Sequence, residues 1–214
     1  MTVPDALLRR ARQARRVMVF TGAGMSAESG VPTYRDASTG LWAKYDPMTL
    51  ATPQAWRQDS ARVWGWYLRR CDNIRKVQPN LGHQSLSHWN RRAEVNIVTQ
   101  NVDDLHERAG SPNVVHLHGK VFDPHCDRCL VKKDVKHYVP DTEKVLPPVC
   151  HCGGQVRPGI VWFGEKLPDE AWMRAVILAK TCDLMLVVGT DASVYPAAQI
   201  PEMAIAQGTF VAEI

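Results

Sequence analysis

Four short runs of apolar and β-branched residues recur along the chain, and each is bounded by small or polar residues. They occupy residues 17–21, 95–99, 184–188 and 209–214. Runs of this kind are typical of buried β-strands. Helical spacing of apolar residues lies between them, at residues 61–75, 83–92, 169–179 and 197–207. Because strands alternate with helices, the pattern predicts an α/β fold with a Rossmann-like, doubly wound parallel sheet.

The first sixteen residues combine five arginines with a helical apolar pattern. Leu7, Leu8, Ala11 and Ala14 fall at helical spacing. An Arg-rich N-terminus can be a mitochondrial transit peptide. This segment, however, continues directly into the first predicted strand. We therefore expect it to be the first helix of the fold, and we expect a cytoplasmic protein.

The composition is that of a globular protein with one core, or with one core and a small additional module. The chain has 214 residues, of which 45% are hydrophobic and 22% are charged. No apolar run approaches the ~20 residues of a membrane helix, so no membrane partner is expected. The N-terminal arginines could bind nucleic acid, but the net charge is only +4 and no aromatic residues are interleaved with them. We expect a solvated helix face, no direct nucleic-acid binding and a monomeric protein.

Residues 125–157 interrupt the alternation of strands and helices. They are rich in Cys, Pro, Lys and Gly and have no helical period of useful length. We expect a small module at residues 123–157, inserted between two parts of a Rossmann-like domain, residues 1–122 and 158–214. Residues 33–53 are also irregular and are expected to form a flexible loop over the crevice at the strand ends.

Four of the six cysteines form two closely spaced pairs. The pairs are Cys126 with Cys129, and Cys150 with Cys152. Four thiolates around a tetrahedral zinc ion make a closed structural site without an open position for catalysis. The second pair has one intervening residue, so the chain must bend tightly there, and His125 or His151 could replace a thiolate. Cys71 and Cys182 are expected to be buried hydrophobic residues.

Three of the predicted strands end beside glycine or amide residues, namely Gly22, Gln100 and Gly189. In doubly wound sheets, ligands bind beyond the carboxyl ends of the strands, so these loops are expected to form one site. The turn at residues 22–30 is suited to a pyrophosphate, because glycines allow close backbone approach and helix N-terminal amides hold negative charge. Its third glycine comes six residues after the second, so the turn alone does not identify the ligand.

Five blocks of the sequence resemble those of the sirtuins and occur in the order that this family has. The first reads Gly-Ala-Gly-Met-Ser-Ala-Glu-Ser-Gly-Val-Pro-Thr-Tyr-Arg, at residues 22–35. The others are residues 99–106, 116–119, 157–165 and 189–197. The resemblance covers the chain from residue 17 to its end. It implies a Rossmann-like fold, NAD as co-substrate and a structural zinc ion.

The resemblance also implies a reaction, in which NAD is consumed to remove acyl groups from the lysines of proteins or peptides. In sirtuins the acyl carbonyl oxygen attacks the ribose carbon that carries nicotinamide, which leaves, and an alkylimidate forms. A histidine then deprotonates a ribose hydroxyl, which attacks the alkylimidate, and water completes the release of lysine. The products are nicotinamide, free lysine and O-acyl-ADP-ribose. The catalytic histidine of the family corresponds to His118, which directly precedes Gly119. Imidazole suits a base because its ordinary pKa lies near neutrality. Asn101 is the second catalytic residue, and His116 is the nearest alternative to His118.

By the same resemblance, the NAD site is drawn from several loops. Its members are Gly22, Ala23, Gly24, Ala27, Tyr34, Arg35, Gln100, Asn101, Asp103, Gly189, Thr190 and Asp191. Asn101 and Asp103 would hold the nicotinamide ribose and carboxamide, and Gln100 would join them at the ribose. Arg35 would lie near the pyrophosphate, where a guanidinium matches phosphate oxygens. A side chain at a strand end could equally cap the next helix, a role that Asp104 could fill.

Tyr67 and Arg70 are three residues apart and therefore share one face of a predicted helix. This pair, after residues 51–53, resembles the sirtuin branch that removes succinyl, malonyl and glutaryl groups and acts more weakly on acetyl groups. A guanidinium can bind an acyl carboxylate through two hydrogen bonds, and a phenol adds a third. The alternative is an ordinary amphipathic helix with surface arginines. Substrate peptides are expected to pair as an added strand beside Val161, Trp162, Phe163 and Gly164.

Two features depart from the sirtuin pattern. Asp191 stands where the family has Ser, and its carboxylate could repel NAD phosphates or accept from a ribose hydroxyl. The sequence also stops at Ile214, so we expect either a truncated C-terminal end or an NAD site with a reduced adenosine pocket. These features leave open a non-catalytic protein that binds acyl-lysine or ADP-ribose, and a mono-ADP-ribosyltransferase would need the same NAD site. The glycine spacing disfavours an NAD-dependent dehydrogenase.

Overall fold

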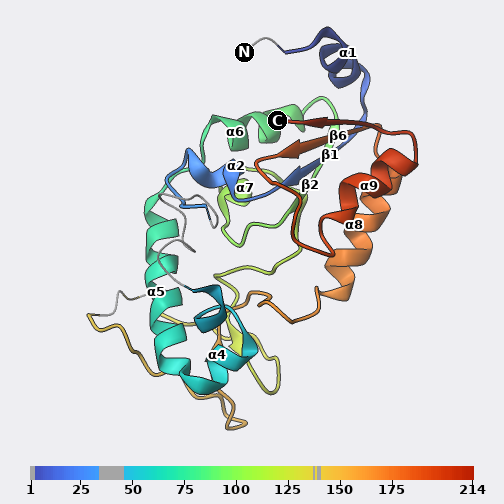
Figure 1. Ribbon diagram of the computed structural model, residues 1–214. Coiled ribbons are helices and arrows are strands. Elements are labelled where there is room, and N and C mark those ends of the chain that lie inside the picture. The colour runs from blue at the N-terminus through green and yellow to red at the C-terminus, as the bar shows by residue number, and fades with distance from the viewer. Residues whose placement is uncertain (1–2, 34–45, 137, 139–140) are drawn as a thin grey trace.

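A parallel sheet forms the centre of the protein in a computed structural model that describes residues 3–33, 46–136, 138 and 141–214 (Figure 1). The strand order is β3-β2-β1-β6-β7, and every neighbouring pair is parallel. The strands span Val114–His116, Glu94–Thr99, Arg16–Thr21, Leu184–Val188 and Phe210–Glu213 in that order. This confirms the predicted doubly wound sheet. The order reverses between β1 and β6, and that is where a ligand site is expected.

Helices cover both faces of the sheet. They are α1 (Asp5–Gln13), α6 (Leu81–Trp89), α8 (Asp169–Thr181) and α9 (Gln199–Ala206). Val17 and Val19 of β1 pack with α1 and α6, whereas Met18 and Phe20 pack with α8 and α9. Figure 1 shows α8 and α9 together on one side of the sheet. Because both faces are covered, the strands read as continuous apolar runs without polar alternation.

A further apolar cluster lies around the long helix α5 (Ser60–Lys76), and residues from segments without long strands or helices pack into it. It includes Trp56 from α4 (Pro53–Gln58), Trp162 and Val156. The remaining short elements are α2 (Gly24–Ala27), η1 (Pro47–Thr49), α7 (Leu105–Arg108) and an antiparallel pair of strands, β4 (His125–Cys126) and β5 (Val156–Arg157). This cluster joins the β4–β5 region to the wall of the site described below.

Side-chain caps account for where two of the helices begin. The side chain of Asn80 accepts from the backbone N–H of His83 at 3.2 Å, so α6 begins at Leu81, two residues before the predicted start. Helix α4 was not predicted. The sequence does contain a helix-start signal there, a threonine followed by a proline. In the structure Thr52 caps α4 by accepting from the N–H of Ala55 at 3.0 Å.

Most of the predicted cofactor loop, residues 34–45, lies outside the described residues. Across the described ranges, no helix has both the length and the apolar character needed to cross a membrane.

Candidate active site and metal centre

A cavity of about 410 Å³ opens at the carboxyl ends of β1, β2 and β6. Its volume is in the range of small-molecule sites, and it lies where the strand order reverses. The predicted site residues that line it are Gly22, Ala23, Gly24, Tyr67, Gln100, Asn101, His118, Val161, Trp162, Phe163, Gly164, Gly189, Thr190 and Asp191. The structure therefore brings the predicted catalytic, cofactor and peptide-binding residues to one place.

Some predicted residues lie elsewhere, and some lining residues were not predicted. Ala27, Arg70 and Asp103 do not line the cavity, and Tyr34 and Arg35 lie outside the described residues. The additional lining residues are Thr33, Ala51, Val102, Ile160, Glu165, Leu167, Val194, Tyr195 and Pro196. Seven of these nine lie within the five sequence blocks, and Ala51 and Leu167 are the exceptions, so membership of a block was the signal that could have found most of them.

The glycine turn after β1 packs directly against the loop after β6. The N–H of Gly24 donates to the carbonyl of Gly189 at 2.8 Å. A Cβ atom at Gly22 would lie 2.5 Å from the Cβ of Thr190, and one at Gly189 would lie 2.3 Å from the nitrogen of Met25. These glycines are therefore required for contact between two protein loops, and not only for the approach of a pyrophosphate.

The side-chain amide of Asn101 is oriented by two hydrogen bonds. Its Nδ2 donates to the carbonyl of Gly22 at 2.9 Å and to Oγ of Ser26 at 3.1 Å. Both amide hydrogens are thereby used, and Oδ1 is the acceptor that Asn101 can offer to a ligand.

Asp103 lies behind the cavity and is only 5% exposed. Its carboxylate accepts from Oγ of Ser26 at 3.0 Å and from the N–H of Leu105 at 3.2 Å. Asp103 thus caps α7, whereas Asp104, which had been considered for that role, makes no capping bond. Burial raises the pKa of Asp103, and these bonds together with the charge of Arg70 counteract the rise.

The backbone determines which ring nitrogen of His118 carries hydrogen. Nδ1 lies 3.0 Å from the carbonyl oxygen of Gln100. Because a carbonyl only accepts, Nδ1 must donate, and Nε2 keeps the lone pair that a base needs. Burial lowers the pKa of His118, and the bond to Gln100 partly offsets this. The alternative base, His116, is buried and does not line the cavity.

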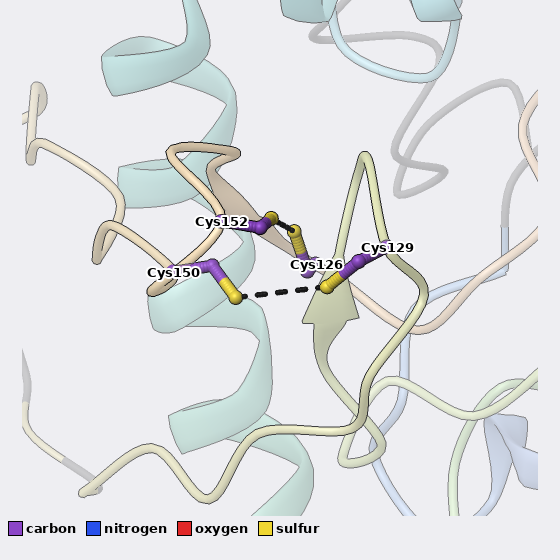
Figure 2. A group of neighbouring side chains, drawn as sticks. All are labelled: Cys126, Cys129, Cys150 and Cys152. Atoms are coloured by element: carbon purple, nitrogen blue, oxygen red, sulfur yellow. Dashed lines mark hydrogen bonds between the residues drawn. The ribbon is translucent and has the colours of Figure 1, made fainter.

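The four predicted cysteines converge, as Figure 2 shows. The sulfurs of Cys126 and Cys152 are 3.5 Å apart, and those of Cys129 and Cys150 are 3.7 Å apart. All four sulfurs lie within 4.8 Å of one another. A tetrahedral zinc ion with Zn–S bonds of about 2.3 Å needs sulfurs about 3.8 Å apart, so the cluster fits a structural zinc site. The two histidines considered as alternative ligands are not part of it.

Two glycines explain how the second cysteine pair closes with a single residue between its members. The N–H of Gly153 donates to the carbonyl of Cys150 at 2.9 Å, and the N–H of Cys150 donates to the carbonyl of Gly154 at 2.7 Å. Gly153 has a φ of +79°, which favours glycine. A Cβ at Gly154 would lie 2.6 Å from the sulfur of Cys126.

Asp127 connects the cysteine cluster to the wall of the cavity. Its carboxylate accepts from Nε1 of Trp56 at 3.0 Å and from the N–H of Gln155 at 2.9 Å. The ring of Trp56 packs on that of Trp162, with centroids 5.6 Å apart. Nε1 of Trp162 then donates to the hydroxyl of Tyr67 at 3.3 Å. The cluster therefore supports the part of the wall that holds Tyr67 and Trp162.

Cys129→Ser is expected to abolish zinc binding and lower the melting temperature, because a structural zinc ion supplies folding free energy. Metal analysis should find about one zinc per unmodified chain and almost none in the variant. Cys182→Ser is the matched control, because this free cysteine lies outside the cluster. Full zinc content in Cys129→Ser would contradict a site of four thiolates.

Comparison with known proteins agrees with the geometry. Residues 22–196 match the model of the Sir2 family. The NAD-dependent protein deacylase of Mycobacterium leprae (strain TN) is 55% identical over 203 residues, which are 93% of this chain and 85% of that protein. A mutant Sir2 homologue in complex with ADP-ribose has a TM-score of 0.92 at 40% identity, over 99% of this chain and 84% of that one. A Sir2 homologue–NAD complex has a TM-score of 0.89 at 41% identity, over 99% and 82%. The chain therefore belongs to the Sir2 family.

Proposed function

We propose that this Sir2-family chain is an NAD-dependent protein-lysine deacylase that prefers succinyl, malonyl and glutaryl groups and acts more weakly on acetyl groups. NAD-dependent protein deacylation is the activity in the name of the M. leprae relative, and the two solved homologues hold ADP-ribose or NAD. One observation carries the proposal: a single cavity contains His118, Asn101 and Tyr67, and Arg70 lies one helical turn beyond Tyr67.

In this proposal His118 and Asn101 act on the nicotinamide ribose. Nε2 of His118 accepts a proton from a ribose hydroxyl, because Nδ1 is already engaged with Gln100. Oδ1 of Asn101 accepts from the same ribose, because its Nδ2 is engaged with Gly22 and Ser26.

Thr190 supplies a further donor to the cavity. Its hydroxyl oxygen accepts from Nε2 of Gln100 at 2.8 Å and from the N–H of Ala192 at 3.1 Å. With two bonds accepted, the hydroxyl hydrogen points to other acceptors, and phosphate or ribose oxygens of NAD would provide them.

Tyr67 and Arg70 form the acyl-selecting part of the site. Both are largely buried on α5, and the apolar residues Ala51, Ile160 and Trp162 line the cavity with Tyr67. A plain acetyl group would meet apolar surface there. A longer acyl chain that ends in a carboxylate would carry its charge past Tyr67 toward the Arg70 guanidinium, which matches carboxylate geometry.

Measuring nicotinamide release and acyl removal together distinguishes two other functions from deacylation. A non-catalytic binder would hold NAD or acyl-lysine without releasing nicotinamide, which would conflict with the placement of His118 and Asn101 in one cavity. A mono-ADP-ribosyltransferase would release nicotinamide while leaving the acyl group on lysine.

The value of kcat/KM for an acyl-lysine peptide should fall at acid pH with a midpoint below 6.5. Burial disfavours the imidazolium of His118 and lowers its pKa from the ordinary value of 6.5, so the free base persists below that pH. His118→Ala should reduce turnover by at least about 100-fold, while calorimetry should show NAD binding within a few fold of the unmodified chain. A midpoint above 6.5, or turnover that survives His118→Ala, would contradict this role.

Arg70→Met should lower kcat/KM for a succinyl-lysine peptide by about 10- to 100-fold, the value of a charge-assisted hydrogen bond. An acetyl-lysine peptide should be affected much less. Arg69→Met is the matched control. Arg69 is the neighbouring arginine on α5, but it does not line the cavity and donates to the carbonyls of Thr142 and Glu143 through solvent-exposed hydrogen bonds. Equal losses on both peptides, or an unchanged succinyl-to-acetyl ratio, would rule out Arg70 as the acyl selector.

A further inference from the structure

His116 occupies a position next to the active site that the proposed reaction does not use. It is the last residue of β3, is 7% exposed, and its ring lies between a backbone carbonyl and a carboxylate. Nδ1 is 3.0 Å from the carbonyl oxygen of Asn101. Nε2 is 2.8 Å from Oε1 of Glu107. His118, two residues later, makes the equivalent contact to the preceding carbonyl, that of Gln100.

The two contacts of His116 determine its protonation state. The Asn101 carbonyl can only accept, so Nδ1 carries a hydrogen. An ionised Glu107 can also only accept, so Nε2 must carry a hydrogen as well. Lys120 donates to the same Glu107 oxygen at 2.7 Å, which favours the ionised carboxylate. Burial raises the pKa of Glu107, but the hydrogen bonds from His116 and Lys120 lower it by more. With a carbonyl oxygen on one side and a carboxylate oxygen on the other, both ring nitrogens of His116 are placed as donors.

This ring holds the peptide that carries Asn101. The N–H of Asn101 donates to Oγ1 of Thr99 at 3.0 Å, and His116 binds the carbonyl of the same residue. Asn101 is thus fixed at both ends of its backbone, while its side chain is fixed by Gly22 and Ser26. A small shift of the backbone at Asn101 would move its Oδ1, and it would also disturb the preceding peptide group, whose Gln100 carbonyl orients His118.

We propose that His116 is a positioning residue of the active site, held as a buried imidazolium by Glu107, and that it fixes the peptide carrying Asn101. The inference rests on the proposed roles of Asn101 and His118. Besides Glu107 and Lys120, the charged or titratable groups near His116 are Asp103 and His106. Burial raises the pKa of Asp103, and the charge of His116 opposes that rise, so the imidazolium also favours an ionised carboxylate behind the cavity.

Nitrogen-15 NMR of the histidine rings tests the protonation state without any substrate. In one sample of the unmodified chain, His116 should show hydrogens on both ring nitrogens, and His118 should show one on Nδ1 alone. Glu107→Gln should convert His116 to a ring with a single N–H, because an amide can donate to Nε2. A single N–H on His116 in the unmodified chain would overturn the proposal and would leave the proposed deacylase function untouched.

Kinetics test the positioning role. His116→Gln and Glu107→Gln should each lower kcat by about 10- to 100-fold, because a small displacement of reacting groups has effects of that size. The KM values for NAD and for the acyl-lysine peptide should change far less. His88→Gln, an exposed histidine on α6, is the matched control and should retain full kcat.

A merely structural role would instead lower the free energy of unfolding without changing kcat per folded molecule. Unchanged kcat in both variants would therefore overturn the inference. If the unmodified chain released no nicotinamide and removed no acyl group, the proposed function would be refuted. The NMR measurement would still decide whether His116 carries hydrogens on both ring nitrogens.

Discussion

The backbone contact between residues 22–24 and Gly189 is the constraint on which the rest of the site depends. It joins the loops that follow β1 and β6, and the positions of Gly22, Gly24 and Gly189 leave no room for a side chain. The same turn supplies the Gly22 carbonyl that orients Asn101. If the two loops were separated, the cavity would lose its floor and Asn101 would lose one of its partners. Loop packing and ligand placement therefore depend on the same three glycines.

The polar groups at the active site are held by hydrogen bonds to other protein groups. His116 and His118 bind consecutive carbonyls, those of Asn101 and Gln100, and Ser26 links Asn101 to Asp103. Buried polar groups that are already hydrogen-bonded need little rearrangement during the reaction. Aromatic packing through Trp56 and Trp162 connects Tyr67 to the cysteine cluster. The cluster thus supports the part of the cavity wall that holds Tyr67 and Trp162.

The sequence predicted the features that depend on local pattern and spacing. The four longer strands follow from continuous apolar runs, and the cysteine cluster follows from two close pairs. Residues brought together only by tertiary packing could not be predicted. No local pattern indicates that Trp56 reaches Asp127, that Asp103 caps α7 in place of Asp104, or that Glu107 faces His116. The requirement for glycine at position 189 was likewise hidden, because it arises from a backbone 165 residues away in sequence, at Gly24.

The most direct test of the central claim is the stoichiometry of a single turnover with NAD and a succinyl-lysine peptide, followed by mass spectrometry. The account predicts one nicotinamide, one free lysine and one O-succinyl-ADP-ribose for each peptide consumed. Nicotinamide release with the acyl group still on lysine would contradict it and would indicate ADP-ribosyl transfer. Loss of the acyl group without consumption of NAD would contradict the assignment of this cavity as an NAD site.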